Sequence, residues 1–179
     1  GLINKLSKPF GHNLKGRKNN LLLIGKTFGH LEQSCYLKEN YSITEGRPPE
    51  INLLNEKNNG DVVLSLINND LILSCHDVSN GGLIIALSEM VMSSEIGVKI
   101  EKPKKLRNLN EYFFGEDQGR YILEINEENL KKVEKILKSN NTYYENIGYT
   151  QENFFEIDSE VKINTNELFK INNQWYNNF

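Results

Sequence analysis

The segment Ser74–Leu83, SCHDVSNGGL, holds the residues best suited to chemistry. It follows a short apolar run and leads into a helical pattern of apolar residues. A helix that starts after a glycine turn presents unpaired backbone N–H groups, which attract phosphate together with the helix dipole. A carboxylate at a strand end can bind Mg²⁺. The sequence therefore predicts Asp77 as a metal ligand and places Ser79, Gly81 and Gly82 beside phosphate.

The same segment also has a purely structural interpretation. Ser79 or Asn80 can cap the helix, and Asp77 can close an Asx turn. His76 suits a supporting role better than catalysis, because His12, His30 and His76 lack zinc-site spacing. A glycine pair at a helix start is a weak signal by itself, so local sequence leaves both interpretations open.

The whole chain has the composition of one globular domain. It has 179 residues, 38% of them hydrophobic, and a formal net charge of −3 with mixed acids and bases. No basic stripe suggests nucleic-acid binding, no basic amphipathic segment suggests membrane binding, and the apolar runs are too short to cross a bilayer. Cys35 and Cys75 do not form a disulfide framework, and no secretory signal is evident. We expect a cytoplasmic protein with reduced thiols.

Hydrophobic periodicity predicts a mixed α+β domain. Expected strands are 21–24, 71–75, 98–100, 120–125, 143–149, 154–157 and 161–163, and expected helices are 56–68, 82–96 with Gly97 as the C-terminal cap, 127–139 and 164–169. Strand 120–125, helix 127–139 and strand 143–149 form a β-α-β unit. We therefore predict a layered α/β sandwich with a mixed sheet, partly ferredoxin-like. Residues 1–20 are expected to be a linker or the tail of a preceding domain, residues 21–179 the domain itself, and residues 26–55 largely loop.

Four blocks in order carry a family resemblance. They are GKTFGHLEQSCYL (25–37), GRPPEINLLNEK (46–57), HDVSNGGLIIALSEM (76–90) and FFGEDQGRYILEI (113–125). Together they resemble the C-terminal domain of the AIR-synthase-related proteins, and within these the phosphoribosylformylglycinamidine (FGAM) synthase family, over roughly residues 1–170. The HD block and the GEDQGR form are similar to the C-terminal domain of the second half of that family's large subunit.

The resemblance implies an ATP-dependent ligase step of purine biosynthesis. Formylglycinamide ribonucleotide, ATP and glutamine-derived ammonia would yield formylglycinamidine ribonucleotide, with Mg²⁺ orienting the phosphates. The family's catalytic histidine and principal ATP-binding segment belong to the first half, so this chain alone is not expected to be catalytic. Implied partners are the preceding domains, a glutaminase subunit and a small bridging subunit.

The family's site residues carry over position by position. Asp77 matches the aspartate that approaches Mg²⁺ or the phosphates of ATP or ADP, and Ser79 lies where a hydroxyl can touch an auxiliary nucleotide. The first half has substrate-binding residues where this chain has Glu116, Asp117 and Gln118. These three residues can equally form a solvated loop, with Arg120 pairing to Glu116 or Asp117.

This chain departs from the family pattern at two positions. Glu32 and Asn80 replace a usual glycine and a usual aspartate. An acid at position 32 beside a phosphate site would repel the phosphate.

Two other functional classes remain open from sequence. The domain can belong to another enzyme of the superfamily, such as a selenophosphate synthetase, a thiamine-phosphate kinase or a hydrogenase-maturation protein. It can also be an interaction module that has lost ligand binding. The aromatic tail of Trp175, Tyr176 and Phe179 can dock on a partner domain or on this domain's own core.

Overall fold

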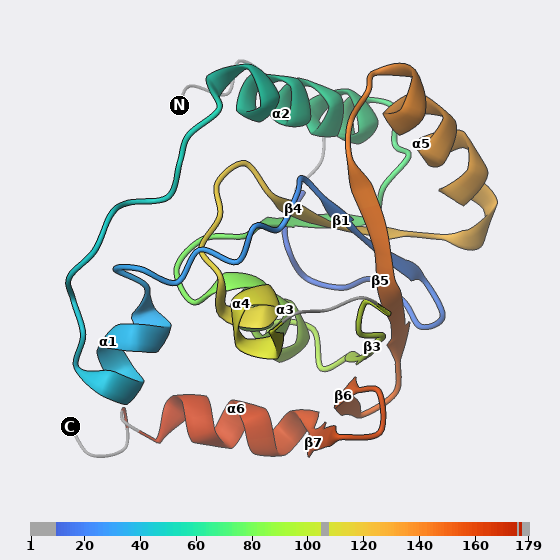
Figure 1. Ribbon diagram of the computed structural model, residues 1–179. Helices are drawn as coiled ribbons and strands as arrows, with labels where there is room; N and C mark the ends of the chain where they lie inside the picture. Colours follow the sequence, from blue (N-terminus) through green and yellow to red (C-terminus); the bar gives the residue numbers. More distant parts are fainter. Residues whose placement is uncertain (1–9, 105–107, 175, 177–179) are drawn as a thin grey trace.

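A computed structural model describes residues 10–104, 108–174 and 176 and shows one seven-stranded sheet with helices on both faces (Figure 1). The strands are β1 (Asn20–Ile24), β2 (Ser74–Asp77), β3 (Gly97–Ile100), β4 (Tyr121–Ile125), β5 (Tyr144–Gln151), β6 (Phe154–Ile157) and β7 (Val161–Asn164). The helices are α1 (Cys35–Tyr41), α2 (Leu53–Asn68), α3 (Gly82–Met92), α4 (Leu109–Phe114), α5 (Glu127–Ser139) and α6 (Thr165–Asn173).

The sheet is mixed, with the strand order β2-β4-β1-β5-β3-β6-β7. Strands β3 and β6 run parallel, and the other neighbouring pairs are antiparallel. Because β1 lies between β4 and β5 and is antiparallel to both, the β4-α5-β5 unit is split by the first strand. The predicted α+β sandwich with a mixed sheet and a β-α-β unit is confirmed.

Alternation along β1 divides the core into two layers. Leu21 and Leu23 belong to one apolar cluster together with α3 and α4, whereas Leu22 and Ile24 belong to the other with α2 and α5. Figure 1 shows α2 and α5 above the sheet and α3 and α4 below it. Each fully buried leucine contributes about 1.5–3 kcal/mol relative to an exposed one, so both faces of the sheet need their helices.

Helix α5 follows its predicted bounds because local signals agree there. The Asn126 side chain accepts a hydrogen bond from the Asn129 backbone N–H, Glu127 and Glu128 occupy the first turn and Lys138 the last. Acids at the start and a base at the end of a helix suit its dipole.

Several predicted elements need correction. Helices α1 and α4 fall in segments without a predicted helix, and α6 is longer than expected. Strand β2 begins at Ser74 and not at Leu71, where the buried apolar run and the predicted strand start. Gly97 opens β3 and does not cap α3, whose C-cap is Ser93. A Cβ at Gly97 would lie 1.9 Å from the Glu152 carbonyl oxygen, so close strand packing explains this glycine.

The described part of the expected N-terminal linker packs onto the sheet. Leu14 is buried, and the buried Glu124 carboxylate accepts hydrogen bonds from the backbone N–H groups of Lys15 and Gly16 and from Asn19 Nδ2. Residues 11–19 are therefore fixed to the domain, while residues 1–9, Trp175 and Phe179 lie outside the described residues. Among the described helices, none has the length and apolar character to cross a membrane.

Candidate functional site

The loop of residues 115–120, here called the acidic loop, organises the backbone around it through Asp117. Asp117 is only 5% exposed. Its Oδ2 accepts hydrogen bonds from the backbone N–H groups of Phe28 and Gly29, both at 2.9 Å, and its Oδ1 accepts one from His30 at 3.3 Å. The carboxylate therefore fixes the 28–30 turn and has little capacity left for a ligand.

Glu116 of the same loop joins two helix starts. Its Oε1 accepts hydrogen bonds from the Cys35 N–H, the first residue of α1, and from the Gly81 N–H, the N-cap of α3, both at 2.8 Å. N–H groups at helix starts lack partners within their own helix and favour a negative charge nearby. The carboxylate thus supplies the negative charge that the sequence suggested phosphate would supply.

Arg120 stabilises the acidic loop by donating hydrogen bonds to its backbone carbonyl groups. It is buried and donates to the Gly115 carbonyl at 2.5 Å, the Asp117 carbonyl at 3.2 Å and the Thr27 hydroxyl at 3.1 Å. Burial lowers the pKa of Arg120, and the nearby Asp117 charge opposes that shift. Among the described residues, Arg120 therefore bonds to neutral oxygens and not to the Glu116 or Asp117 carboxylate, a pairing that the sequence had left open. The solvated-loop interpretation is wrong for Asp117, which is buried.

The glycine turn, residues 77–82, lies against the acidic loop. Gly81 caps α3 with φ of 80° and no side-chain cap, so neither Ser79 nor Asn80 has the expected capping role. The Gly82 N–H donates to the Ser79 carbonyl at 3.1 Å. A Cβ at Gly82 would lie 2.7 Å from the Gly115 carbonyl oxygen, so Gly82 allows the two backbones to touch. Both predicted phosphate-binding amides already have acceptors in this arrangement.

Asp77 is accessible, unlike the amides. Its side chain is 71% exposed, and the adjacent His76 ring has its Nδ1 3.4 Å from Asp77 Oδ1. His76 is held by Glu89 at 2.8 Å and by the His12 ring at a centroid distance of 5.0 Å, as its expected supporting role requires. Across residues 10–104, 108–174 and 176, no three His, Cys, Asp or Glu side chains group as a metal site.

Glu32 is engaged in a contact unrelated to phosphate. Its Oε2 accepts a hydrogen bond from the Arg47 N–H at 2.5 Å, Gln33 Nε2 donates to the Gly46 carbonyl at 2.7 Å, and His30 Nε2 lies 2.8 Å from the Arg47 carbonyl. These contacts fasten the connection between α1 and α2 to the 30–33 turn. The Glu32 carboxylate is therefore directed at the Arg47 backbone.

The two cysteines are poor nucleophiles at neutral pH. Burial raises the pKa of Cys75 to about 12. The Cys35 pKa is also raised, first by burial and then by the Glu116 charge. Only thiolates are strongly reactive, so the described structure favours structural roles for both thiols.

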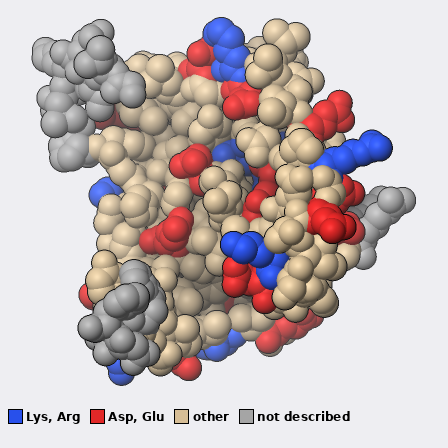
Figure 2. All heavy atoms as spheres, turned by 90° about the vertical axis from the view of Figure 1, so that its left-hand side faces the viewer, with Lys and Arg blue, Asp and Glu red and all other residues tan. Residues whose placement is uncertain are grey.

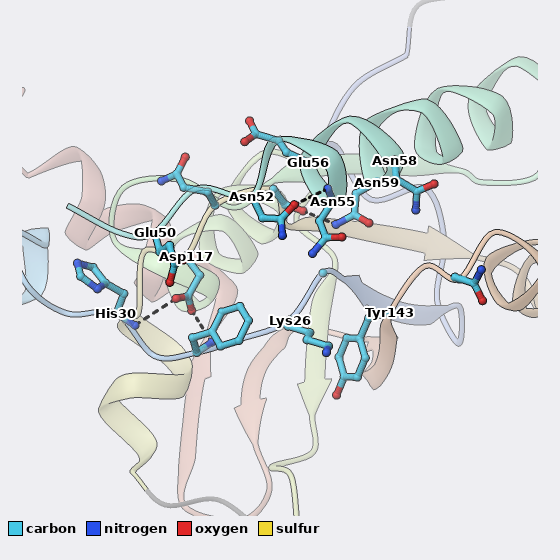
Figure 3. Close-up of a pocket in the computed structure, with 15 residues that line it drawn as sticks. Lys26, His30, Glu50, Asn52, Asn55, Glu56, Asn58, Asn59, Asp117 and Tyr143 are labelled. Atoms are coloured by element: carbon cyan, nitrogen blue, oxygen red, sulfur yellow. Dashed lines mark hydrogen bonds between the residues drawn. The ribbon is translucent and has the colours of Figure 1, made fainter. Parts of the chain in front are cut away.

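A cavity of about 510 Å³, here called the amide pocket, lies between the N-terminal half of α2 and the loops that follow β1 and precede β4 and β5 (Figure 3). Asp117 and Gln118 line it, whereas Asp77, Ser79, Gly81, Gly82 and Glu116 do not. Its lining is Gly25, Lys26, Phe28, His30, Glu50, Asn52, Asn55, Glu56, Asn58, Asn59, Asp117, Gln118, Gly119, Asn141 and Tyr143. Sequence reasoning missed the asparagines of residues 52–59, although their clustering is a usable signal.

On the face that Figure 2 shows, basic side chains do not gather into one region. On the side shown in Figure 2, Lys and Arg side chains are interspersed with Asp and Glu, and the described residues form no broad basic patch. This agrees with the net charge of −3.

Comparison with known proteins assigns the family. Residues 18–157 match the family described as AIR synthase related protein, C-terminal domain. The chain is 44% identical over all 179 residues to phosphoribosylformylglycinamidine synthase subunit PurL of Pelagibacter ubique, and 37% identical over 175 residues to PurL of Rhodopseudomonas palustris strain HaA2. In each case the chain spans about a quarter of the relative, 24% of its length.

Solved structures show the same fold at low sequence identity. Thermotoga maritima PurL complexed with ATP matches 89% of this chain and 27% of that one, with a TM-score of 0.68 and 12% identity. Thiamine-monophosphate kinase of Stenotrophomonas maltophilia matches 84% of this chain and 53% of that one, with a TM-score of 0.57 and 12% identity. With the predicted blocks, the matched residues and the shared sheet in agreement, the chain belongs to the family of AIR synthase related proteins, as their C-terminal domain.

Proposed function

We propose that this chain serves as the second-half C-terminal domain of an FGAM synthase. That enzyme is a ligase of purine biosynthesis, which converts formylglycinamide ribonucleotide, ATP and glutamine-derived ammonia to formylglycinamidine ribonucleotide. The observation that carries the proposal is the 44% identity to the Pelagibacter ubique PurL subunit across the whole chain. The thiamine-monophosphate kinase match shares only the fold, at 12% identity.

The role proposed for the chain itself is positioning and not catalysis. The carboxylates of Asp117 and Glu116 accept hydrogen bonds from backbone N–H groups. Such contacts suit a domain that acts as a rigid support. We propose the preceding domains of the same cytoplasmic enzyme, a glutaminase subunit and a small bridging subunit as its partners. One solved structure with this fold is described as PurLQS from Thermotoga maritima.

A nucleotide with Mg²⁺ is the ligand proposed for the glycine turn. Similar folds were solved with ATP, ADP and AMPPCP. Asp77 fits a metal ligand because it is exposed, and the Ser79 hydroxyl lies nearby in sequence, but Gly81 can meet phosphate only if Glu116 withdraws. When bound, Mg²⁺ would neutralise phosphate charge. Of the proposed substrate contacts, the exposed Gln118 is the most available, since Glu116 and Asp117 are already engaged.

A domain exchange tests the ligase proposal. The matching quarter of the Pelagibacter ubique subunit is replaced by this chain, and formation of formylglycinamidine ribonucleotide is measured with ATP and ammonia. We expect activity within about tenfold of the parent, a loss of at most about 1.4 kcal/mol in transition-state stabilisation. A matched exchange with the Rhodopseudomonas palustris domain, 37% identical to this chain, controls for the junctions. An inactive exchange beside an active control would contradict the proposal.

A second candidate, an interaction module without ligand binding, is favoured by the occupied amides of Gly81 and Gly82. Titration with ADP and Mg²⁺ separates the two candidates, because a bound ligand raises the melting temperature. Nucleotide binding predicts a saturable rise that Asp77→Asn reduces. An unchanged melting temperature at millimolar ligand favours the interaction module.

A further inference from the structure

The amide pocket contains hydrogen-bonding groups that the fold itself does not use. The Asn59 side chain donates to the Gly119 carbonyl at 2.9 Å, and Asn58 donates to the Thr142 hydroxyl at 3.0 Å. By contrast, within the described part of the chain the side-chain amides of Asn55 and Asn141 have no hydrogen-bond partner. Figure 3 shows Asn55 projecting from α2 toward the wall that carries Lys26 and Tyr143.

The charges around the pocket disfavour an anionic ligand. Glu50, Glu56 and Asp117 line it against a single lysine, Lys26. The Asp117 charge is met by three backbone N–H groups, but Glu50 and Glu56 have no such partners within the described residues. A phosphate group inside the pocket would be repelled by these carboxylates, whereas amide groups can donate to and accept from uncharged partners.

Aromatic surface completes the lining. The Phe28 side chain is 80% exposed although it borders the pocket, so it packs little against the core. The Tyr143 ring lies on another wall, with Lys26 Nζ 5.7 Å from its centroid. Exposed aromatic faces favour stacking with planar rings, and a cavity of about 510 Å³ is within the usual size range of small-molecule sites.

We infer that the amide pocket binds an uncharged planar heterocycle with ring donors and acceptors, the chemical class of the nucleobases. Asn55 and Asn141 hydrogen-bond the edge of the ring, and Phe28 or Tyr143 stacks on its face. Any phosphate attached to the ligand lies outside the pocket. This inference stands on the pocket alone and does not depend on the ligase proposal.

The test uses the chain with adenosine as the probe, and with inorganic phosphate in parallel. We expect adenosine to raise the melting temperature saturably and to give a measurable heat of binding, whereas phosphate alone does neither. Asn55→Ala should weaken adenosine binding about fivefold to tenfold, as the loss of one neutral hydrogen bond does. The substitution keeps the helix start intact, because Asn52 accepts from the Asn55 backbone N–H and alanine favours helix.

Asn172→Ala is the matched control, since Asn172 is an exposed asparagine on α6. Binding equal to the unaltered chain is expected there. The inference is overturned if millimolar adenosine gives no saturable signal, if phosphate alone gives the same shift, or if Asn55→Ala binds adenosine normally. If adenosine does not bind but the domain exchange gives an active enzyme, the assignment of a nucleobase ligand to the amide pocket is wrong and the ligase proposal still stands.

Discussion

The acidic loop and the glycine turn are joined by hydrogen bonds from the Gly81 N–H to Glu116 and from the Val78 N–H to the Arg120 carbonyl. The carboxylates of Asp117 and Asp77 nevertheless have opposite surroundings. Asp117 is 5% exposed and accepts from three backbone N–H groups. The Asp77 side chain is 71% exposed beside one histidine. Both stand in motifs that suggest ligand binding. The difference teaches that nearby unpaired backbone donors decide whether an acid in such a motif is free for a ligand.

The largest effect is expected where the two regions touch. Gly82→Ala should lower the free energy of unfolding by about 3 kcal/mol or more, because Gly82 has φ of 71° and its Cβ would collide with the backbone at residues 113–115. Urea unfolding measures the change. Gly81→Ala is the control: φ is 80° there, but the close atoms belong to the Ile85 side chain and not to backbone, so a smaller loss is expected. Equal losses for both variants would contradict the close backbone contact.

The next largest effect belongs to the acidic loop. Asp117→Ala should cost about 2–4 kcal/mol of unfolding free energy, because the N–H groups of Phe28, Gly29 and His30 lose their acceptor. Chemical denaturation at constant pH is the measurement. A loss below about 0.5 kcal/mol, the usual size for a surface substitution, would mean that water replaces the carboxylate without cost.

Asp77 should behave in the opposite way. Asp77→Asn is expected to change the free energy of unfolding by at most about 0.5 kcal/mol, because the Asp77 side chain is exposed and no backbone N–H of the described residues donates to it. The same denaturation assay applies. A loss comparable to that of Asp117→Ala would abolish the contrast between the two regions and would make Asp77 a structural acid.

The smallest expected effect is on the reactivity of Cys35, whose backbone N–H bonds to Glu116 of the acidic loop. Burial and then the Glu116 charge raise the Cys35 pKa, so Glu116→Gln should remove the second contribution, lower that pKa and increase the thiolate fraction at pH 8. Alkylation of Cys35 by iodoacetamide should become roughly twofold to threefold faster. Cys75, with a pKa of about 12, serves as the internal control and should stay unmodified. An unchanged Cys35 rate would show that burial alone sets its reactivity.

Sequence reasoning succeeded where local and tertiary signals agree. Helix α5 has a cap, a dipole-matched charge pattern and one apolar stripe, so its bounds could be predicted to the residue. Helix α1 has no buried residue, and Glu116 bonds its first N–H from a loop far along the chain. Such a helix leaves no periodic apolar signal, which explains why it was missed.

The candidate site shows the same limit. The motifs singled out Asp77, Glu116 and Asp117 as candidate site residues. Which of these carboxylates accept hydrogen bonds from backbone N–H groups depends on tertiary contacts with the 28–35 segment. The amide pocket needs α2 to lie beside the loop after β1, a juxtaposition that no single stretch of sequence contains.

The position of β1 in the middle of the sheet has a consequence for biosynthesis. Leu22 lies opposite Leu123 on one side and Asn146 on the other, so β1 must wait for two partners that are translated much later. Meanwhile four consecutive apolar residues, Leu21 to Ile24, emerge from the ribosome unprotected. Long-range pairing of this kind slows folding and exposes nascent chains to aggregation, which makes chaperone capture of the growing polypeptide most valuable before β5 is complete.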